Sequence, residues 1–275
     1  MPVKGRLREP SVDLLEHAGF APDAPDERAL AFACAGAPLE VLLVRAADIP
    51  EYVQDGAVDC GITGADLVRE RGGNVRELLR LDYGHCTLEP AVLIESEVAT
   101  VEELDGLRVA TSYPRLTHEL LRDRGVAAEL VDVTGSVEVA PRLGLADAIV
   151  DLVSSGNTLR TNGLRSLGAL FSSEAVLIGP EETGRGALQL AAVFRSVVEA
   201  RASRYLMLNA PESALAEICE IVPGSRAPSV LPLSEPGMVA VHALVPAREV
   251  WRLLPRLEEA GASSILLVPI ERLIA

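Results

Sequence analysis

The sequence predicts an α/β protein with two doubly wound lobes and a C-terminal βαββαβ domain of the ferredoxin-like kind. Between residues 107 and 178, apolar segments typical of strands alternate with segments of helical periodicity. Such alternation predicts a mainly parallel sheet covered by helices. A similar series precedes it, and the chain returns after residue 170, so we expect two lobes with a cleft between them. From residue 205 the order becomes strand, helix, two strands, helix, strand, which indicates a separate domain.

Composition indicates a folded globular chain and argues against membranes and nucleic acids as its partners. Of 275 residues, 49% are hydrophobic and 24% are charged. No segment approaches the roughly 20 apolar residues of a transmembrane helix, and residues 1–6 contain no apolar signal core, so we expect a cytoplasmic protein without a membrane partner. The net charge of −15, with no basic stripe, argues against nucleic acid. Small phosphorylated substrates stay possible, because they need only a local positive site.

Cysteines and histidines do not predict a metal centre. The four cysteines lie far apart and are expected to be reduced thiols. No histidine lies four residues from another histidine or cysteine, so a zinc site is not expected; the four are His17, His85, His118 and His242. Neither a Walker loop nor a G-x-G-x-x-G fingerprint is present, so any nucleotide must be held in another way.

The first lobe is expected to begin with a helix that Gly19 ends, and the second to follow after residue 88. For the first lobe we expect helices at 9–18, from Asp48 and at 66–71, and strands at 29–36, 39–45 and 58–64. For the second we expect strands at 107–112, 127–133, 147–153 and 170–178, and helices at 115–124, 136–143 and 158–167. The expected domain limits are 1–88 with 172–200 for the first lobe, 89–171 for the second and 203–275 for the last domain.

The C-terminal domain is expected to follow a long helix at 186–202. Its strands are expected at 205–209, 229–233, 238–245 and 264–270, and its helices at 212–221 and 247–260.

The segment from Ala146 to Arg160 is the strongest candidate for a substrate site. A buried strand ends at Asp151 to Val153, and Ser154, Ser155, Gly156, Asn157 and Thr158 follow as a turn that starts a helix. Free backbone N–H groups and the positive helix end then face one point, which suits a phosphate. Asp151 could accept hydrogen bonds from sugar hydroxyls or help to hold Mg²⁺. An ordinary strand–turn–helix junction with Ser155 as the N-cap fits the same residues.

Four further clusters lie at predicted strand ends or turns, and Glu138 lies upstream of the candidate segment. They are Lys4-Gly5-Arg6, Arg45, Gly61 to Asp66, and Thr111 to Arg115 with Tyr113. Basic side chains can bind phosphates, glycines allow close approach of the backbone, and the tyrosine could stack on a base. Each has a structural explanation as well: a solvated basic end, a surface ion pair, or a simple turn.

Together these segments resemble one family, ATP phosphoribosyltransferase in its long form. The resemblance covers nearly the whole chain, and its most specific segment is GSVEVAPRLGLADAIVDLVSSGNTLRTNGL from Gly135 to Leu164. C-terminal matches include Arg204 to Asn209, Ala227 to Val230 and Gly261 to Ile270. The resemblance implies two catalytic lobes like type II periplasmic binding proteins and a regulatory third domain.

The family resemblance implies transfer of the phosphoribosyl group of phosphoribosyl pyrophosphate to N1 of ATP, with Mg²⁺, as the first step of histidine biosynthesis. Residues 154–158 would hold the 5′-phosphate, and Asp151 with Glu138 would face the ribose hydroxyls. The ATP and pyrophosphate side would be lined by Lys4, Arg6, Arg45, Asp66 and Tyr113. Histidine would inhibit through the third domain, near Ser229 and Ala243, and the chain would assemble into dimers and hexamers without a separate regulatory subunit.

The sequence departs from the family at three places. Only Met1 to Val3 stand where the family has a strand, so either the recorded start is not the true one or the first lobe lacks a strand. Asn157 stands where threonine or arginine is common, and Ala227-Pro228-Ser229 replaces the usual Ser-Pro-Thr.

Two other classes of protein share part of this pattern. A solute-binding protein would have similar lobes, but the third domain and the phosphate-type loop argue against it. A non-catalytic regulatory paralogue would be expected to have lost the pattern at 146–160, which is intact here.

Overall fold

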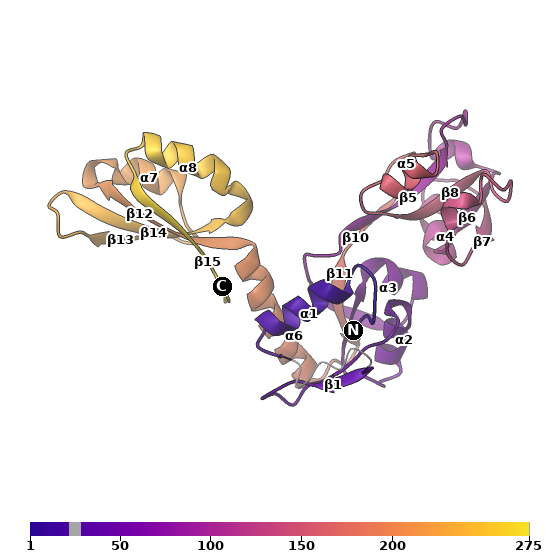
Figure 1. Cartoon of the computed structure of the whole chain (residues 1–275), viewed down its shortest axis with the longest axis horizontal. Coiled ribbons are helices and arrows are strands. Elements are labelled where there is room, and N and C mark those ends of the chain that lie inside the picture. The colour runs from indigo at the N-terminus through magenta and orange to yellow at the C-terminus, as the bar shows by residue number, and fades with distance from the viewer. Residues whose placement is uncertain (22–28, 275) are drawn as a thin grey trace. The chain divides into compact units, whose positions relative to one another are not determined.

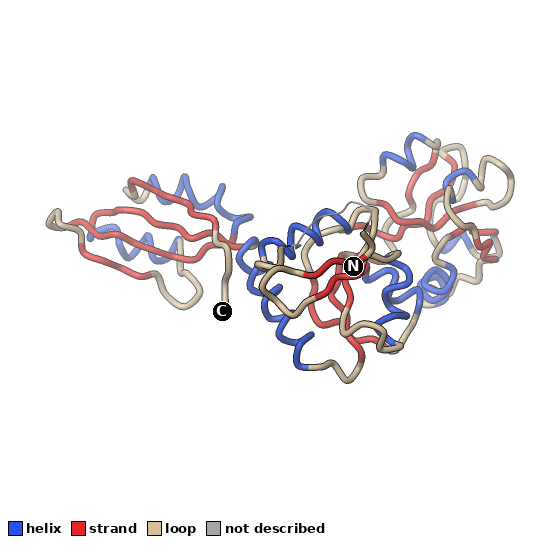
Figure 2. The backbone as a smooth tube through the Cα atoms, turned by 60° about the horizontal axis from the view of Figure 1, so that its bottom comes forward, coloured by secondary structure: helices blue, strands red, loops and turns tan. Residues whose placement is uncertain are grey.

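The computed structural model describes residues 1–21 and 29–274, which divide into two units. Unit 1 runs from Met1 to Ala191 and unit 2 from Ala192 to Ala275. The boundary lies inside α6 (Arg185–Arg201). The elements are drawn in Figure 1 and the distribution of helices and strands in Figure 2.

Unit 1 contains two larger sheets and a small antiparallel ribbon. The first sheet has the order β3-β11-β4, and both outer strands run antiparallel to β11. Its strands are β3 (Gly61–Gly64), β4 (Val75–Arg80) and β11 (Ala175–Pro180), and its helices are α1 (Arg8–His17), α2 (Ile49–Gln54) and α3 (Ala65–Arg71). The ribbon pairs β1 (Ala31–Ala33) with β2 (Glu40–Leu42). These two strands are shorter than expected.

The second sheet has the order β10-β5-β8-β6-β7, with β9 also paired to β5. Its strands are β5 (Cys86–Leu93), β6 (Arg108–Thr111), β7 (Glu129–Asp132), β8 (Ala148–Val153), β9 (Leu164–Ser166) and β10 (Phe171–Ser173). Its α-helices are α4 (Pro114–Arg122) and α5 (Asn157–Thr161). Within this sheet, β6 pairs parallel with β7 and with β8, and its other strand pairs are antiparallel. The second sheet is therefore mixed and the first is antiparallel, so neither is mainly parallel as expected.

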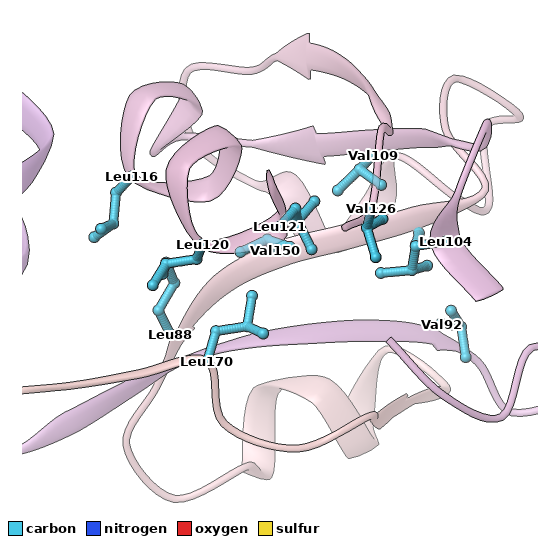
Figure 3. Close-up of a cluster of buried hydrophobic side chains, with 11 residues drawn as sticks. Leu88, Val92, Leu104, Val109, Leu116, Leu120, Leu121, Val126, Val150 and Leu170 are labelled. Carbon is cyan, nitrogen blue, oxygen red and sulfur yellow. The ribbon is translucent and has the colours of Figure 1, made fainter. Parts of the chain in front are cut away.

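The core of the second sheet lies between its strands and helix α4. Leu88 from β5, Val109 from β6 and Val150 from β8 are fully buried, and they pack against Leu116 and Leu121 of α4 (Figure 3). Burying such side chains stabilises the fold by about 1.5–3 kcal/mol each. This core fixes the strand β8 that leads into the candidate phosphate loop.

Three expected elements differ from the structure. The helix expected at 136–143 is only a 3₁₀ turn at Val137–Val139, and Pro141 has no N–H with which to continue a helical hydrogen-bond pattern. The helix expected at 158–167 is the short α5, after which Gly163 has a φ of 70° and β9 follows. The strand expected at 170–178 is two strands of different sheets, β10 and β11, separated by Glu174.

The expected limits of the second lobe can be compared with the residues that form the second sheet. The second sheet begins at Cys86 and ends at Ser173, a few residues outside the expected limits of 89–171. At the N-terminus, Pro2 forms a parallel bridge with Val44, with Val3 N donating to Val44 O at 2.8 Å. The strand that the family resemblance implies there is therefore reduced to a bridge.

Unit 2 has the strand order β13-β14-β12-β15, all antiparallel, as the expected βαββαβ layout requires. Its strands are β12 (Ser203–Pro211), β13 (Ser229–Pro232), β14 (Met238–Pro246) and β15 (Ser263–Pro269), and its helices are α7 (Leu215–Ile221) and α8 (Val250–Glu259). Both helices cover one face of the sheet (Figure 1). Alternate strand residues such as Leu206, Leu208 and Val241 are buried beneath them.

Candidate substrate site

The candidate phosphate loop follows β8 directly. Ala148 to Val150 are buried in the sheet, whereas Ser154, Ser155, Asn157 and Thr158 are exposed. Gly156 has a φ of 70°, a left-handed backbone that glycine adopts without strain. The chain can therefore turn sharply and begin α5 at Asn157. The turn and the helix start lie where the sequence predicted them.

Arg160 is a basic residue at this loop that sequence analysis did not assign to the site. Its guanidinium Nη2 donates to Asn157 Oδ1, which lies one helical turn earlier. The spacing of three residues within a helix was the signal available in the sequence. A positive charge beside the loop strengthens its suitability for an anion.

Asp151 and Glu138 form a pair of neighbouring carboxylates at the end of β8. Burial raises the pKa of Asp151, and the negative charge of Glu138 raises it further. The hydrogen bond from Leu152 N to Asp151 Oδ1, 2.8 Å long, acts in the opposite direction. Carboxylates in this arrangement can accept hydrogen bonds from hydroxyl groups or share a hard cation.

Asp66 is the centre of a second cluster, which begins in the first sheet. It follows β3 in the first turn of α3 and is fully buried. Its Oδ1 accepts hydrogen bonds from Arg6 Nη2 at 3.1 Å and from Ser173 Oγ at 2.5 Å. Its Oδ2 has no hydrogen-bond partner among the described residues. A buried carboxylate oxygen without a donor is costly, and it is free to receive a donor from a ligand.

Ser173 is a second residue that sequence analysis did not assign. It is 4% exposed at the end of β10, and its Oγ also accepts a hydrogen bond from Asp66 N at 3.0 Å. Because Ser173 lies 107 residues from Asp66 along the chain, no local pattern could have paired them.

Tyr113 connects the two clusters electrostatically. Burial raises its pKa well above the usual value, and the charges of Asp66 and Asp151 raise it further, while Arg6 opposes the shift. Tyr113 immediately precedes Pro114, the first residue of α4, and its N–H donates to Thr111 Oγ1 at 3.0 Å. The structure therefore brings Arg6, Asp66, Tyr113 and Asp151 into one region of unit 1.

Lys4 and Arg45 are exposed, and each lies close in sequence to a residue that contacts this region or the strand leading to it. Arg6 is fixed by its bond to Asp66 and by Nε donating to Gly84 O at 3.1 Å, and Lys4 lies two residues before it. Arg45 precedes Ala46, whose carbonyl accepts a hydrogen bond from Thr63 of β3 at 2.7 Å. Arg45 therefore lies next to the strand that leads to Asp66.

The two residues predicted for regulation do not share one face of the unit 2 sheet. Ser229 is exposed on β13 and pairs with His242 of β14. Ala243, the next residue, is only 3% exposed and belongs to the core beneath α7 and α8. Successive strand residues point to opposite faces, so the side chains of Ser229 and Ala243 lie on opposite sides of the sheet.

The fold is that of an α/β protein with an appended C-terminal domain. The family model described as ATP phosphoribosyltransferase matches residues 45–197, and the model described as HisG, C-terminal domain, matches residues 200–272. The chain belongs to the ATP phosphoribosyltransferase family of histidine biosynthesis, in its long form. This confirms the predicted family, and the α/β fold class is confirmed as well.

Full-length relatives support the same assignment. An ATP phosphoribosyltransferase of Methanosarcina mazei is 42% identical over 283 residues, covering 100% of this chain and 98% of the relative. One from Halobacterium salinarum is 43% identical over 277 residues with the same coverage. The solved ATP phosphoribosyl transferase (HisG:HisZ) complex from Thermotoga maritima aligns with a TM-score of 0.61 at 24% identity, covering 72% of this chain and 96% of that chain. No helix in the described residues is long and apolar enough to cross a membrane.

Proposed function

We propose that the protein transfers the phosphoribosyl group of phosphoribosyl pyrophosphate to N1 of ATP, giving phosphoribosyl-ATP and pyrophosphate. The lone pair of adenine N1 attacks C1 of the ribose with inversion, and the bond from C1 to the pyrophosphate oxygen breaks. The departing pyrophosphate takes the electron pair. This chemistry depends on positioning and charge stabilisation more than on a strong base. The main support is the family match over residues 45–197, together with the buried carboxylate of Asp66 and the turn after β8 in the same unit.

The phosphoribosyl pyrophosphate side of the proposed site is the end of β8. Backbone N–H groups from Ser154 to Thr158 would bind the 5′-phosphate, with the charge of Arg160 beside them. Asp151 and Glu138 would accept hydrogen bonds from the ribose hydroxyls, whose donors relieve the unfavourable pairing of two carboxylates.

The ATP side of the proposed site is the cluster around Asp66. Its free Oδ2 would accept a hydrogen bond from the adenine amino group, and Tyr113 would lie against the base. Lys4, Arg6 and Arg45 would supply positive charge for the phosphate groups.

Mg²⁺ fits the donor set at the ribose side, because Asp151 and Glu138 offer hard oxygen ligands close to one another. When bound, it would neutralise charge on the departing pyrophosphate. The same two carboxylates would then hold both the ribose hydroxyls and the cation.

Regulation and assembly belong to unit 2 in this proposal. Histidine would inhibit by binding to this unit, with Ser229 at the exposed sheet face and Ala243 acting only through packing.

The sheet face opposite α7 and α8 has apolar side chains that are exposed to water. Among them are Tyr205, Leu266 and Val268, at 38%, 57% and 42% exposure. Such a face is suited to contact with further copies of the chain, as in a dimer or hexamer. No separate regulatory subunit is then needed.

An ultraviolet assay of phosphoribosyl-ATP formation tests the proposal directly. Purified protein would be given ATP, phosphoribosyl pyrophosphate and Mg²⁺, with and without histidine. We expect product formation that histidine lowers and that Mg²⁺ removal abolishes. No product at saturating substrate would contradict the reaction, whereas activity that ignores histidine would contradict only the regulatory part.

A further inference from the structure

The chain passes between the two sheets of unit 1 along two short segments. Residues 81–85 join β4 to β5, and Glu174 alone joins β10 to β11. Asp82, His85 and Glu174 lie on these segments, and one ligand atom from each lies within 4.8 Å of the others. The sequence predicted no zinc site, because no histidine lies four residues from another histidine or cysteine, and the carboxylate that completes this group is 89 residues from His85.

Backbone contacts fix the two segments beside one another. Leu81 N donates to Ala175 O at 3.0 Å, and Ala175 N donates to Tyr83 O at 2.9 Å. Asp82 N also donates to Glu174 Oε2 at 3.1 Å. The three side chains therefore converge because the main chain holds their origins together, and not through a chance meeting of long side chains.

The side chains can move the short distance that a metal requires. His85 Nε2 lies 3.3 Å from Asp82 Oδ1, and these side chains are 62% and 66% exposed. Glu174 Oε1 is 3.2 Å from Arg80 Nη1. Arg80 also pairs with Glu77 at 3.1 Å, so it keeps a carboxylate partner if Glu174 turns to an ion. The Arg80 side chain is 65% exposed, so water can also solvate its guanidinium when Glu174 turns, whereas the Glu174 side chain is only 15% exposed and stays close to the group.

We propose that Asp82, His85 and Glu174 bind one Zn²⁺ ion, with water in the remaining coordination position. One imidazole nitrogen and two carboxylate oxygens are a mixed donor set that Zn²⁺ accepts, whereas Mg²⁺ prefers oxygen alone. Three protein ligands and one water give the tetrahedral geometry of an open zinc site. The proposal does not depend on the reaction proposed above.

A metal ion here would flank the residues that hold Asp66. Gly84 O, within the first segment, accepts the hydrogen bond from Arg6 Nε, and Ser173 immediately precedes Glu174. Both Arg6 and Ser173 donate to Asp66 Oδ1. An ion tying Glu174 to the first segment would therefore restrict the parts of the chain on which the position of Asp66 depends.

Zinc titration of the full chain tests the site. Chelator-treated protein would be titrated with Zn²⁺ in the presence of excess Mg²⁺, using calorimetry and elemental analysis after dialysis. We expect one Zn²⁺ ion per chain, and we expect His85→Ala and Glu174→Gln each to weaken binding by at least about tenfold. His17→Ala is the matched control, because His17 also pairs with an aspartate, Asp13, at 3.2 Å but lies outside the three-residue group.

Three results would overturn the proposal: no Zn²⁺ binding by the wild type, unchanged affinity in both variants, or an equal loss in His17→Ala. Unchanged affinity would place the ion outside this group. Before the titration, the melting temperature of each variant without metal would be compared with that of the metal-free wild type, to show that the variant is folded. If one of them fails this check, Asp82→Asn takes its place under the same criteria.

Discussion

Substitution of Asp151 should lower activity without lowering stability at neutral pH. Burial of its carboxylate and the negative charge of Glu138 both make the ionised form of Asp151 less favourable in the folded protein. The pKa of Asp151 is higher in the folded protein than in the unfolded chain. The free energy of unfolding therefore falls as the pH rises from the pKa of the unfolded state through that of the folded state. A carboxylate kept under such conditions points to a role with substrate.

We expect Asp151→Asn to lower kcat/KM by about 10²-fold or more. We also expect it to gain stability relative to the wild type as pH rises from about 3.5 to 7, because the amide has no charge to bury. Urea unfolding across this range and the ultraviolet assay measure the two effects.

Asp147→Asn is the control for this substitution. Hydrogen bonds from Arg108 lower the pKa of Asp147, so its contribution to stability is lost as pH falls, the opposite sign. This variant should keep its activity. Full activity in Asp151→Asn, or a relative loss of stability toward neutral pH, would contradict the assignment.

Ser173 is expected to position Asp66. Removal of its hydroxyl by Ser173→Ala leaves the buried carboxylate with one donor fewer, and should lower the free energy of unfolding by about 1–3 kcal/mol. The KM for ATP should rise more than the KM for phosphoribosyl pyrophosphate, because Asp66 belongs to the proposed ATP side. Ser172→Ala, on the same strand but exposed, should change neither quantity. Equal behaviour of the two variants would show that the bond to Asp66 has no such role.

At the scale of elements, the start of α4 is stabilised from a different helix. Arg115 N and Leu116 N donate to the two carboxylate oxygens of Glu70, at 3.1 and 2.8 Å. Glu70 lies on α3, so a side chain of the first sheet's helix caps a helix of the second. Nearby, Arg69 of α3 forms an ion pair with Glu119 of α4.

Glu70→Ala is expected to lower the free energy of unfolding by about 0.5–2 kcal/mol, the range for loss of an N-cap. Glu119→Ala removes only a partly exposed ion pair and should cost about 0–1 kcal/mol. Chemical denaturation of both variants compares the two. If Glu119→Ala were the more damaging change, the capping role of Glu70 would be wrong.

Elements with strong local signals were predictable, and those set by distant partners were not. The segment from Ala148 to Thr158 has a buried strand, a glycine turn and a helix start in consecutive residues, and the structure follows it. The division of 170–178 into β10 and β11 depends on pairing with β5, β3 and β4, which are up to 117 residues away. Local periodicity contains no information on such pairing.

The candidate site was predictable to the same extent. The positions of Asp66, Tyr113 and Asp151 at or just after predicted strand ends identified them as candidate binding residues. Ser173 and Glu174 were absent from the prediction, because their partners are distant in sequence. Ala243 was predicted for regulation from the resemblance alone; its side chain packs in the core of unit 2, and its role in regulation stays a prediction.

At the scale of the whole molecule, the open face of the unit 2 sheet should decide the oligomeric state. Leu266→Glu places a charge on this apolar face and is expected to shift the assembly toward smaller species in light scattering after size exclusion. Trp251→Glu changes a residue that is 67% exposed on α8, on the covered side of the sheet, and should leave the assembly unchanged. An unchanged mass for Leu266→Glu would exclude this face as the contact between copies.

The position of β11 has a consequence for how the chain acquires its structure. Strands β3 and β4 both pair with β11, which begins at Ala175, whereas every strand of the second sheet lies between Cys86 and Ser173. During synthesis the second sheet can form as soon as its own residues have left the ribosome. The first sheet must wait for β11, and closing that long loop is slow and exposes unpaired edges meanwhile. The first sheet therefore forms late, although its strands β3 and β4 are synthesised early. Mutations in β11 should lower the folding yield in cells more than mutations in β7 do.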